Sequence, residues 1–133
     1  MLAHASVIGF VPVSDLKAAE DFYAGKLGLT VVDRDNPYAL VLSSNGTMVR
    51  CALAEDAQPQ PFTILGWQVP EIEAAVADLI AAGIQPIRYP FLTQDANGIW
   101  TATDGAGFVA WFNDPDGNVL SLSQHTGAAC VSK

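Results

Sequence analysis

Few residues of this sequence are of the types that carry out chemistry, and those few are widely spaced. The two histidines, His4 and His125, lie near opposite ends of the chain, and the two cysteines are Cys51 and Cys130. Two cysteines are too few for a disulfide framework or a zinc site. Ser121 has no His–Asp pair in its neighbourhood that would activate it as a nucleophile. The spacing therefore favours neither nucleophilic catalysis nor a metal site.

Arg50 is the most informative single residue, because it lies inside a strand-like and mostly apolar segment. A buried guanidinium without a partner is costly, so it needs a carboxylate or an anionic ligand. Two interpretations are open. Arg50 could reach the end of its strand and pair with a loop acid such as Glu55 or Asp56. Alternatively, it could hold the carboxylate of a bound ligand through two parallel hydrogen bonds.

The three tryptophans could provide stacking surfaces for a ligand, although tryptophans in a chain that is 50% hydrophobic are more often core residues. Strand alternation assigns Trp67 to the core and Trp111 to a cavity. Trp100 follows a long polar stretch, residues 90–98, and loops of that length are often lids. Trp100 is therefore a further candidate for ligand contact.

The overall composition excludes several classes of protein. The 133 residues include 14 acidic and 6 basic ones, and the net charge of −8 would repel the phosphates of a nucleic acid. No apolar stretch approaches the roughly 20 residues that cross a membrane, and the N-terminal residues lack a signal-peptide pattern. We expect a soluble, cytoplasmic protein with no nucleic-acid partner and no membrane partner.

The first half of the chain has the pattern of a strand, a helix and three further strands. Residues 5–13 are rich in Val, Ile and Phe, and the Ser14-Asp15 pair that follows is a helix N-cap. Apolar residues then recur at spacings of three and four up to Gly28, which predicts a helix lying on a sheet. Strand-like runs follow at residues 29–34, 38–43 and 47–53, separated by turn-forming residues.

The same order then starts again. A strand is predicted over residues 62–69, a helix over 71–82 with Pro70 at its first position, a strand over 84–89, and a hairpin of strands 107–113 and 118–124. Residues 54–61 carry charge, amides and two prolines, which predicts a linker. We therefore predict a single domain, residues 1–133, with module one (5–53), the linker (54–61), module two (62–124) and a C-terminal tail (125–133).

The repeat can be followed position by position. One constant offset superposes Ile8 on Ile64 and Val13 on Val69, and a larger offset superposes Arg50 on Ser121 in the closing strands. Identity between the halves is weak, but the pattern and the order agree. The sequence therefore predicts two copies of a βαβββ module, which is an α+β protein.

These features together resemble the vicinal oxygen chelate superfamily, also called the glyoxalase/bleomycin resistance/dioxygenase family. The resemblance extends over about residues 7–124 and implies two βαβββ modules that form a curved mixed β-sheet cavity, usually in a homodimer. It depends on the order of the following motifs: Val13-Ser14-Asp15-Leu16, Phe22-Tyr23, Leu27-Gly28-Leu29, Gly66-Trp67-Gln68-Val69 and Trp111-Phe112-Asn113-Asp114-Pro115-Asp116-Gly117-Asn118.

The resemblance also identifies where metal-dependent members of the family bind their metal. Their ligands come from the first and last strands of each module, and the matching positions hold Ile8, Arg50, Ile64 and Ser121. Two isoleucines cannot bind a divalent cation, and Arg50 would repel one. We therefore expect no metal at this place and no other cofactor.

Strand alternation places further side chains beside those four positions. The inferred lining is apolar and aromatic with a few polar groups, which is typical of a small-molecule site, and we expect no catalytic residue in it. The expected ligand-binding residues are Phe10, Met48, Arg50, Gln68, Trp100, Trp111, Ser121 and Ser123.

The leading functional hypothesis is a metal-independent protein that binds a hydrophobic or aromatic small molecule, with antibiotic or toxin sequestration as a role that the resemblance implies. The alternative is a glyoxalase-type lyase, isomerase or dioxygenase with a displaced metal site, so whether the protein is an enzyme stays open. A third possibility is a cavity filled by its own side chains. The charge of −8 favours a cationic ligand, whereas Arg50 favours an anionic one.

Overall fold

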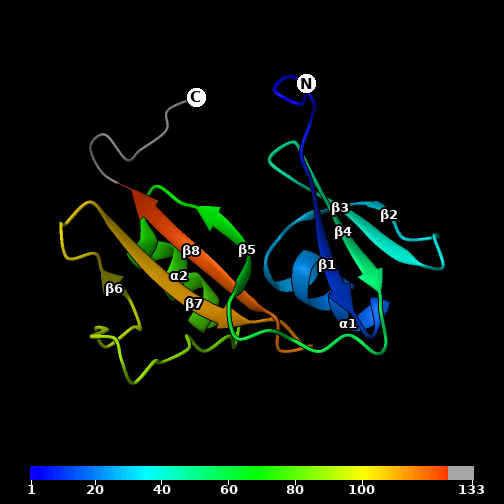
Figure 1. The fold of residues 1–133 in the computed structure, drawn as a ribbon. Helices are drawn as coiled ribbons and strands as arrows, with labels where there is room; N and C mark the ends of the chain where they lie inside the picture. The colour runs from blue at the N-terminus through cyan, green and yellow to red at the C-terminus, as the bar shows by residue number, and fades with distance from the viewer. Residues whose placement is uncertain (126–133) are drawn as a thin grey trace. The chain divides into compact units, whose positions relative to one another are not determined.

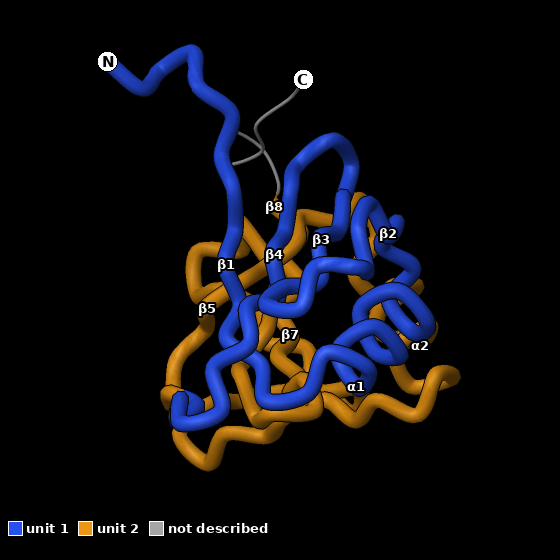
Figure 2. The backbone as a smooth tube through the Cα atoms, turned by 90° about the vertical axis from the view of Figure 1, so that its right-hand side faces the viewer, with its two compact units in different colours: residues 1–59 blue, residues 60–133 orange. Residues whose placement is uncertain are grey.

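The computed structural model describes residues 1–125, so the predicted tail beyond residue 125 and Cys130 lie outside the described residues. The chain divides into two compact units, Met1–Pro59 and Gln60–Lys133 (Figure 2). The division falls within the segment 54–61.

Unit 1 contains a four-stranded mixed sheet with helical turns on one face (Figure 1). The strands follow the order β1-β4-β3-β2, in which β1 and β4 are parallel and the other pairs are antiparallel. The predicted strand–helix–three-strand order is confirmed. Its elements are β1 (Ile8–Val13), α1 (Leu16–Glu20), η1 (Asp21–Lys26), β2 (Thr30–Asp33), β3 (Ala39–Ser44) and β4 (Thr47–Leu53).

The predicted N-cap of the first helix is confirmed. Asp15 accepts hydrogen bonds from the backbone N–H groups of Lys17 (2.9 Å) and Ala18 (3.1 Å), which have no partner within the helix. The helix differs from the prediction after Glu20, where it widens into the π-helix η1. The N–H of Leu27 there donates to the carbonyl of Phe22, five residues back.

One face of the unit 1 sheet packs against the helical turns. Val11 and Val13 of β1 and Val49 and Cys51 of β4 are buried, as strand alternation requires when one face is covered. The residues of opposite parity in β1, among them Ile8 and Phe10, are 44% and 63% exposed. We call this second surface the helix-free face of unit 1.

Unit 2 repeats this architecture (Figure 1). Its strand order is β5-β8-β7-β6, again with the first and last strands of the unit in parallel contact. The α+β fold of two βαβββ modules is therefore confirmed. The elements are β5 (Thr63–Gln68), α2 (Ile72–Ala81), β6 (Trp100–Thr101), β7 (Gly107–Asn113) and β8 (Val119–His125).

The strand predicted over residues 84–89 is wrong. This segment is irregular, and the two-residue strand β6 takes its place beside β7. Pro86 and Pro90 explain the difference, since proline has no N–H to donate to a ladder. The segment keeps one backbone hydrogen bond to β7, from Ile87 N–H to the carbonyl of Trp111 (2.7 Å).

The start of α2 also differs from the prediction. Glu71 is the N-cap residue, so Pro70 precedes the cap instead of occupying the first helical position. Glu71 makes no capping hydrogen bond with its side chain. The N–H of Ile72 instead donates to the side-chain oxygen of Gln124 on β8 (2.8 Å), which attaches the helix to the sheet.

The predicted hairpin at the end of unit 2 is confirmed, and its turn is built around Asp114. One carboxylate oxygen of Asp114 accepts from the backbone N–H groups of Asp116 and Asn118, both at 2.9 Å. The other oxygen accepts from the side-chain amide of Asn118, also at 2.9 Å. Asp114 and Asn118 are only 5% and 3% exposed, so these bonds are shielded from water.

No helix within residues 1–125 combines the length and the apolar character that crossing a membrane requires.

Candidate functional site

The candidate residues of unit 1 lie on one face of its sheet. The register pairs Phe10 of β1 with Arg50 of β4, and Arg50 with Val41 of β3. Met48 is two residues from Arg50 along β4 and therefore has the same orientation. The structure thus brings Phe10, Met48 and Arg50 together on the helix-free face, as the alternation predicts.

Arg50 has no ionic partner within residues 1–125. The ion pairs of this part of the chain join Lys17 to Asp21 and Arg34 to Glu20. The guanidinium of Arg50 makes no hydrogen bond to any described residue, although the residue is half-buried. The interpretation in which Arg50 pairs with Glu55 or Asp56 is therefore wrong for the described residues.

The candidate residues of unit 2 form two rows across its sheet. In the first row, Gly66 of β5, Ser121 of β8 and Trp111 of β7 are neighbours in register. The second row continues to β6 and consists of Gln68, Ser123, Val109 and Trp100. Partners in register point to the same side of a sheet. The five predicted ligand-binding residues of unit 2 therefore share one face, which we call the helix-free face of unit 2: Gln68, Trp100, Trp111, Ser121 and Ser123.

The first row is closely packed at Gly66. A methyl group added to Gly66 would approach the hydroxyl oxygen of Ser121 to 2.5 Å, closer than atoms tolerate. Glycine therefore leaves the space into which the Ser121 side chain extends. Ser121 is buried and Gln68 is exposed, so the polar groups of this face range from shielded to open.

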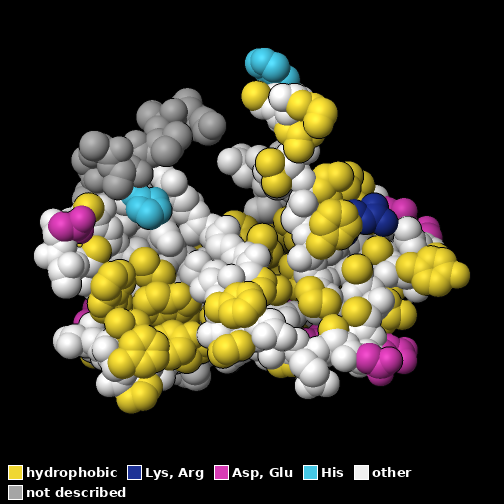
Figure 3. Space-filling view, in the orientation of Figure 1, with side chains coloured by type: hydrophobic (Ala, Val, Ile, Leu, Met, Phe, Trp, Pro, Cys, Tyr) yellow, Lys and Arg dark blue, Asp and Glu magenta, His cyan; other side chains and the backbone are white. Residues whose placement is uncertain are grey.

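Four aromatic rings cluster on unit 2. Trp111 lies with its ring centroid 6.3 Å from that of Trp100 and 5.4 Å from that of Tyr89, and Tyr89 lies 5.4 Å from Phe91. Trp67 belongs to the other face, where it stacks on the buried Phe112 at 6.3 Å. Its own burial is intermediate, so it lies at the margin of the core and not fully within it as predicted. Figure 3 shows hydrophobic side chains gathered over β6 and the segment before it, at the lower left.

Sequence reasoning missed Tyr89 and Phe91. Tyr89 was expected to end a strand, whereas it lies in an irregular segment and its ring packs on the edge of Trp111. The signal in the sequence was the run Tyr89-Pro90-Phe91, in which a proline separates two aromatic residues. A proline at that place predicts that the strand ends. The two aromatic side chains then need not point to the alternating faces that a strand would impose.

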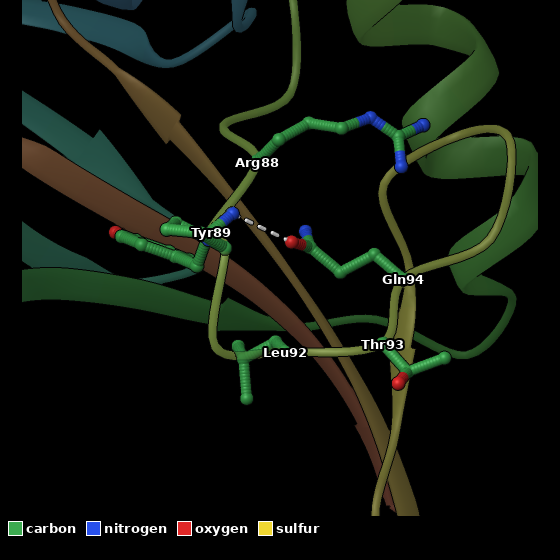
Figure 4. A pocket seen from close by; sticks show the side chains of 6 residues that line it. Arg88, Tyr89, Leu92, Thr93 and Gln94 are labelled. Atoms are coloured by element: carbon green, nitrogen blue, oxygen red, sulfur yellow. Dashed lines mark hydrogen bonds between the residues drawn. The ribbon is translucent and has the colours of Figure 1, made fainter.

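Gln94 holds the segment that carries these rings. Its side-chain oxygen accepts from the N–H of Tyr89 (2.8 Å), as Figure 4 shows. Its side-chain nitrogen donates to the carbonyls of Ile87 (2.9 Å) and Gly98 (2.8 Å). One side chain therefore satisfies three backbone groups that a strand ladder would otherwise pair.

Two hollows adjoin Gln94. The one in Figure 4 has a volume of about 430 Å³ and is lined by Arg88, Tyr89, Pro90, Leu92, Thr93 and Gln94. The other has a volume of about 600 Å³, and its lining includes Phe91, Ile99 and Trp100 together with Leu92, Thr93 and Gln94. Both volumes are of the size that small-molecule sites have, and Trp100 is the sequence-predicted residue that lines one of them.

The positions that the family resemblance assigns to metal ligands do not suit a metal. Ile8 and Arg50 share the helix-free face of unit 1, and Ile64 lies at an irregularity of β5, between Thr63 and Leu65. Isoleucine offers no donor atom and a guanidinium repels cations, so Ser121 would be the one donor in the set. Elsewhere among residues 1–125, no group of three or more His, Cys, Asp or Glu side chains could hold a metal ion.

The fold defines the class of protein: two βαβββ modules, each with a mixed four-stranded sheet. A family model described as the glyoxalase/bleomycin resistance protein/dioxygenase superfamily matches residues 2–122. The chain therefore belongs to this superfamily. No curated protein matches the sequence.

Solved structures of the same superfamily have a similar fold. A member from Sphaerobacter thermophilus is 22% identical with a TM-score of 0.72, over 94% of this chain and 100% of that one. A bleomycin resistance determinant encoded on the transposon Tn5 is 20% identical with a TM-score of 0.71, over 92% and 98% of the two chains. A glyoxalase/bleomycin resistance protein/dioxygenase from Alicyclobacillus acidocaldarius is 18% identical with a TM-score of 0.70, over 97% of each chain.

Proposed function

We propose that this protein binds a small hydrophobic or aromatic molecule without a metal ion and holds it without chemical conversion. The observation that carries the proposal is the cluster of Trp100, Trp111, Tyr89 and Phe91 beside the helix-free face of unit 2. Aromatic rings provide flat apolar surfaces on which a ligand ring can stack. Ser121, Ser123 and Gln68 share that face and provide the few polar groups that orient a ligand.

The residues at the predicted metal positions support a metal-independent protein. Ile8 and Ile64 have no donor atoms, and Arg50 brings a positive charge of its own. Antibiotic or toxin sequestration is the physiological role that we propose for such binding. The likeness to a bleomycin resistance determinant, which is a likeness of fold, agrees with that role.

The proposal predicts that the purified protein binds a neutral aromatic probe, 2-naphthalenemethanol, equally well before and after treatment with a chelator. Isothermal titration calorimetry with and without Ni²⁺, Zn²⁺, Fe²⁺ and Mg²⁺ measures this. Trp111→Leu should weaken binding about two- to tenfold, since one aromatic contact contributes about 0.5–1.5 kcal/mol. Mass spectrometry should recover the probe unchanged.

Trp67→Phe is the matched control for Trp111→Leu. Trp67 lies on the opposite face of the same sheet and stacks on Phe112, so its replacement should leave the affinity for the probe within twofold of the original. A stoichiometric metal that is required for binding would contradict the proposal. Equal losses in the two variants would also contradict it.

We further propose that the chain forms a homodimer and that β1 contributes to the interface. β1 is an edge strand, and Ile8 and Phe10 on it expose 44% and 63% of their surface. Val7, directly before β1, exposes 75%. An exposed apolar edge is a surface on which a second chain can pair. Val7→Glu should therefore shift the dimer towards monomer in sedimentation-velocity experiments, because it buries an unpaired charge.

The control for the assembly experiment is Val32→Glu, at an exposed position of the other edge strand, β2. This variant should sediment as the original protein does. A monomeric original protein would refute the assembly proposal without affecting the proposal on ligand binding.

A further inference from the structure

We propose that the helix-free face of unit 1 is itself a binding site for apolar monocarboxylates, in which the Arg50 guanidinium binds the carboxylate. The inference goes beyond the proposed function, whose aromatic cluster lies on unit 2, and it adds the charge and the chemical class of a ligand. It is drawn from the surroundings of one side chain on the helix-free face of unit 1.

Arg50 is surrounded by apolar residues. It is the one charged residue in the sequences of β1, β3 and β4. Its neighbours in register are Phe10 and Val41, and Met48 and Ala52 flank it along β4 on the same face. A half-buried guanidinium in such surroundings loses contact with water and gains no hydrogen bond from the described residues in return.

The nearest carboxylate along the row is that of Asp33, on the far side of Val41. Two strand spacings separate Arg50 from it, which is roughly 10 Å. One oxygen of Asp33 accepts from the N–H of Asp35 instead (2.9 Å). The Arg50 guanidinium is therefore available to an external anion.

Three basic side chains that line hollows already have partners. Lys17 donates to Asp21 (2.6 Å) and Arg34 donates to Glu20 (3.1 Å). Arg88, in unit 2, donates to the carbonyl of Ala96 (2.6 Å) and is exposed to solvent. Arg50 differs from all three because it is half-buried and has no partner among residues 1–125. A bound anion would therefore contribute more hydrogen bonding to Arg50 than to the other three side chains.

The surroundings select the class of anion. A guanidinium matches a carboxylate through two parallel hydrogen bonds. A phosphate dianion would need a second cation or further donors, and β1, β3 and β4 supply no second basic side chain. Phe10, Met48 and Val41 favour an apolar group attached to the carboxylate. The chain's net charge of −8 opposes anions at long range, but salt screens exposed charges beyond about 8 Å.

The inference is tested with two probes of nearly equal shape, 2-naphthoate and the neutral 2-naphthalenemethanol. Calorimetry with the full-length protein should show the carboxylate binding about ten- to a hundredfold more tightly than the alcohol, the range expected for a charge-assisted pair. Arg50→Gln should remove this preference and leave the affinity for the alcohol within twofold. Arg50→Lys should retain an intermediate preference, because lysine keeps the positive charge but cannot donate the two parallel hydrogen bonds of a guanidinium.

Arg88→Gln is the matched control, since Arg88, like Arg50, has no carboxylate partner among residues 1–125, and it lines a hollow of unit 2. It should leave the preference unchanged. If Arg88→Gln and not Arg50→Gln removed the preference, the carboxylate site would be the hollow of Figure 4, and the assignment to Arg50 would be overturned.

The outcomes separate this inference from the proposed function. Equal binding of both probes by the original protein would overturn the inference and leave the proposed function standing. Binding of neither probe would overturn both. Circular dichroism of each variant shows whether it has folded, and the Arg50→Lys variant provides a second reading if Arg50→Gln has not.

Discussion

Replacing Gln94 with alanine is expected to lower the free energy of unfolding by about 2–4 kcal/mol, because three backbone groups lose their partner at once. The N–H of Tyr89 and the carbonyls of Ile87 and Gly98 are bound to this one amide in a half-buried setting. Urea denaturation measures the loss. Hydrogen exchange should show that the Tyr89 amide becomes accessible before the β7–β8 ladder opens.

The Gln94 variant should also bind the neutral aromatic probe more weakly, since Tyr89 contacts Trp111 and depends on Gln94 for its position. Gln94→Glu should have an intermediate effect, because a carboxylate can accept from Tyr89 and cannot donate to the two carbonyls. Asn97→Ala is the control, since Asn97 lies in the same loop and donates to Asp95 through its backbone N–H, which the substitution keeps. If Gln94→Ala destabilised the protein no more than this control does, water would replace the three hydrogen bonds of Gln94 with no loss in the free energy of unfolding, and the prediction would be wrong.

The second large effect is expected at the β7–β8 turn. Asp114→Ala should lower the free energy of unfolding by about 2–4 kcal/mol, because it removes three buried or part-buried hydrogen bonds to a charged acceptor. Domains of this size are stable by about 5–15 kcal/mol, so thermal unfolding should show a clear decrease in Tm.

Asp104→Ala is the matched control for Asp114→Ala. Asp104 also caps a turn by accepting from a backbone N–H, that of Ala106 (2.9 Å), but it is exposed and makes a single such bond. Its replacement should cost less than about 1 kcal/mol. Equal losses in the two variants would mean that burial of the Asp114 carboxylate contributes nothing.

Much of the fold could be predicted from the sequence, because its signals are local. Strand alternation and turn residues located the strands 47–53 and 107–113 with the bounds that the structure has. The two offsets of the repeat agree with the register as well. Phe10 pairs with Arg50 in unit 1, and Gly66 pairs with Ser121 in unit 2, at the equivalent positions.

The main error in the predicted secondary structure arose where a side chain replaces the backbone hydrogen bonds of a regular strand pair. The strand predicted over residues 84–89 has the right apolar composition, but its prolines remove donors and Gln94 satisfies the remaining groups from elsewhere in the loop. The hydrophobic periodicity of a sequence cannot predict such a contact between a side chain and distant backbone groups. The widened helix after Glu20 has a different cause, because an apolar stripe is compatible with both α-helical and π-helical turns.

The candidate site was predictable in part. The orientation of Met48, Trp111 and the serines followed from alternation, which depends only on strand geometry. The partner of Arg50 did not follow from nearness in the sequence. Glu55 and Asp56 come after the end of β4 at Leu53, and the chain between Arg50 and that end extends over about 10 Å.

The second module is longer than the first between its helix and its last strand, because the offset that relates Arg50 to Ser121 exceeds the one that relates Ile8 to Ile64. The added chain includes the loop that Gln94 holds. Unit 2 thus carries a replaceable part that unit 1 lacks. Changes in that loop can vary which molecules the protein accepts, while the sheets on which folding depends keep their sequence. Related proteins with different ligands should accordingly differ most between α2 and β7, and exchange of this one segment should transfer ligand preference from one to another.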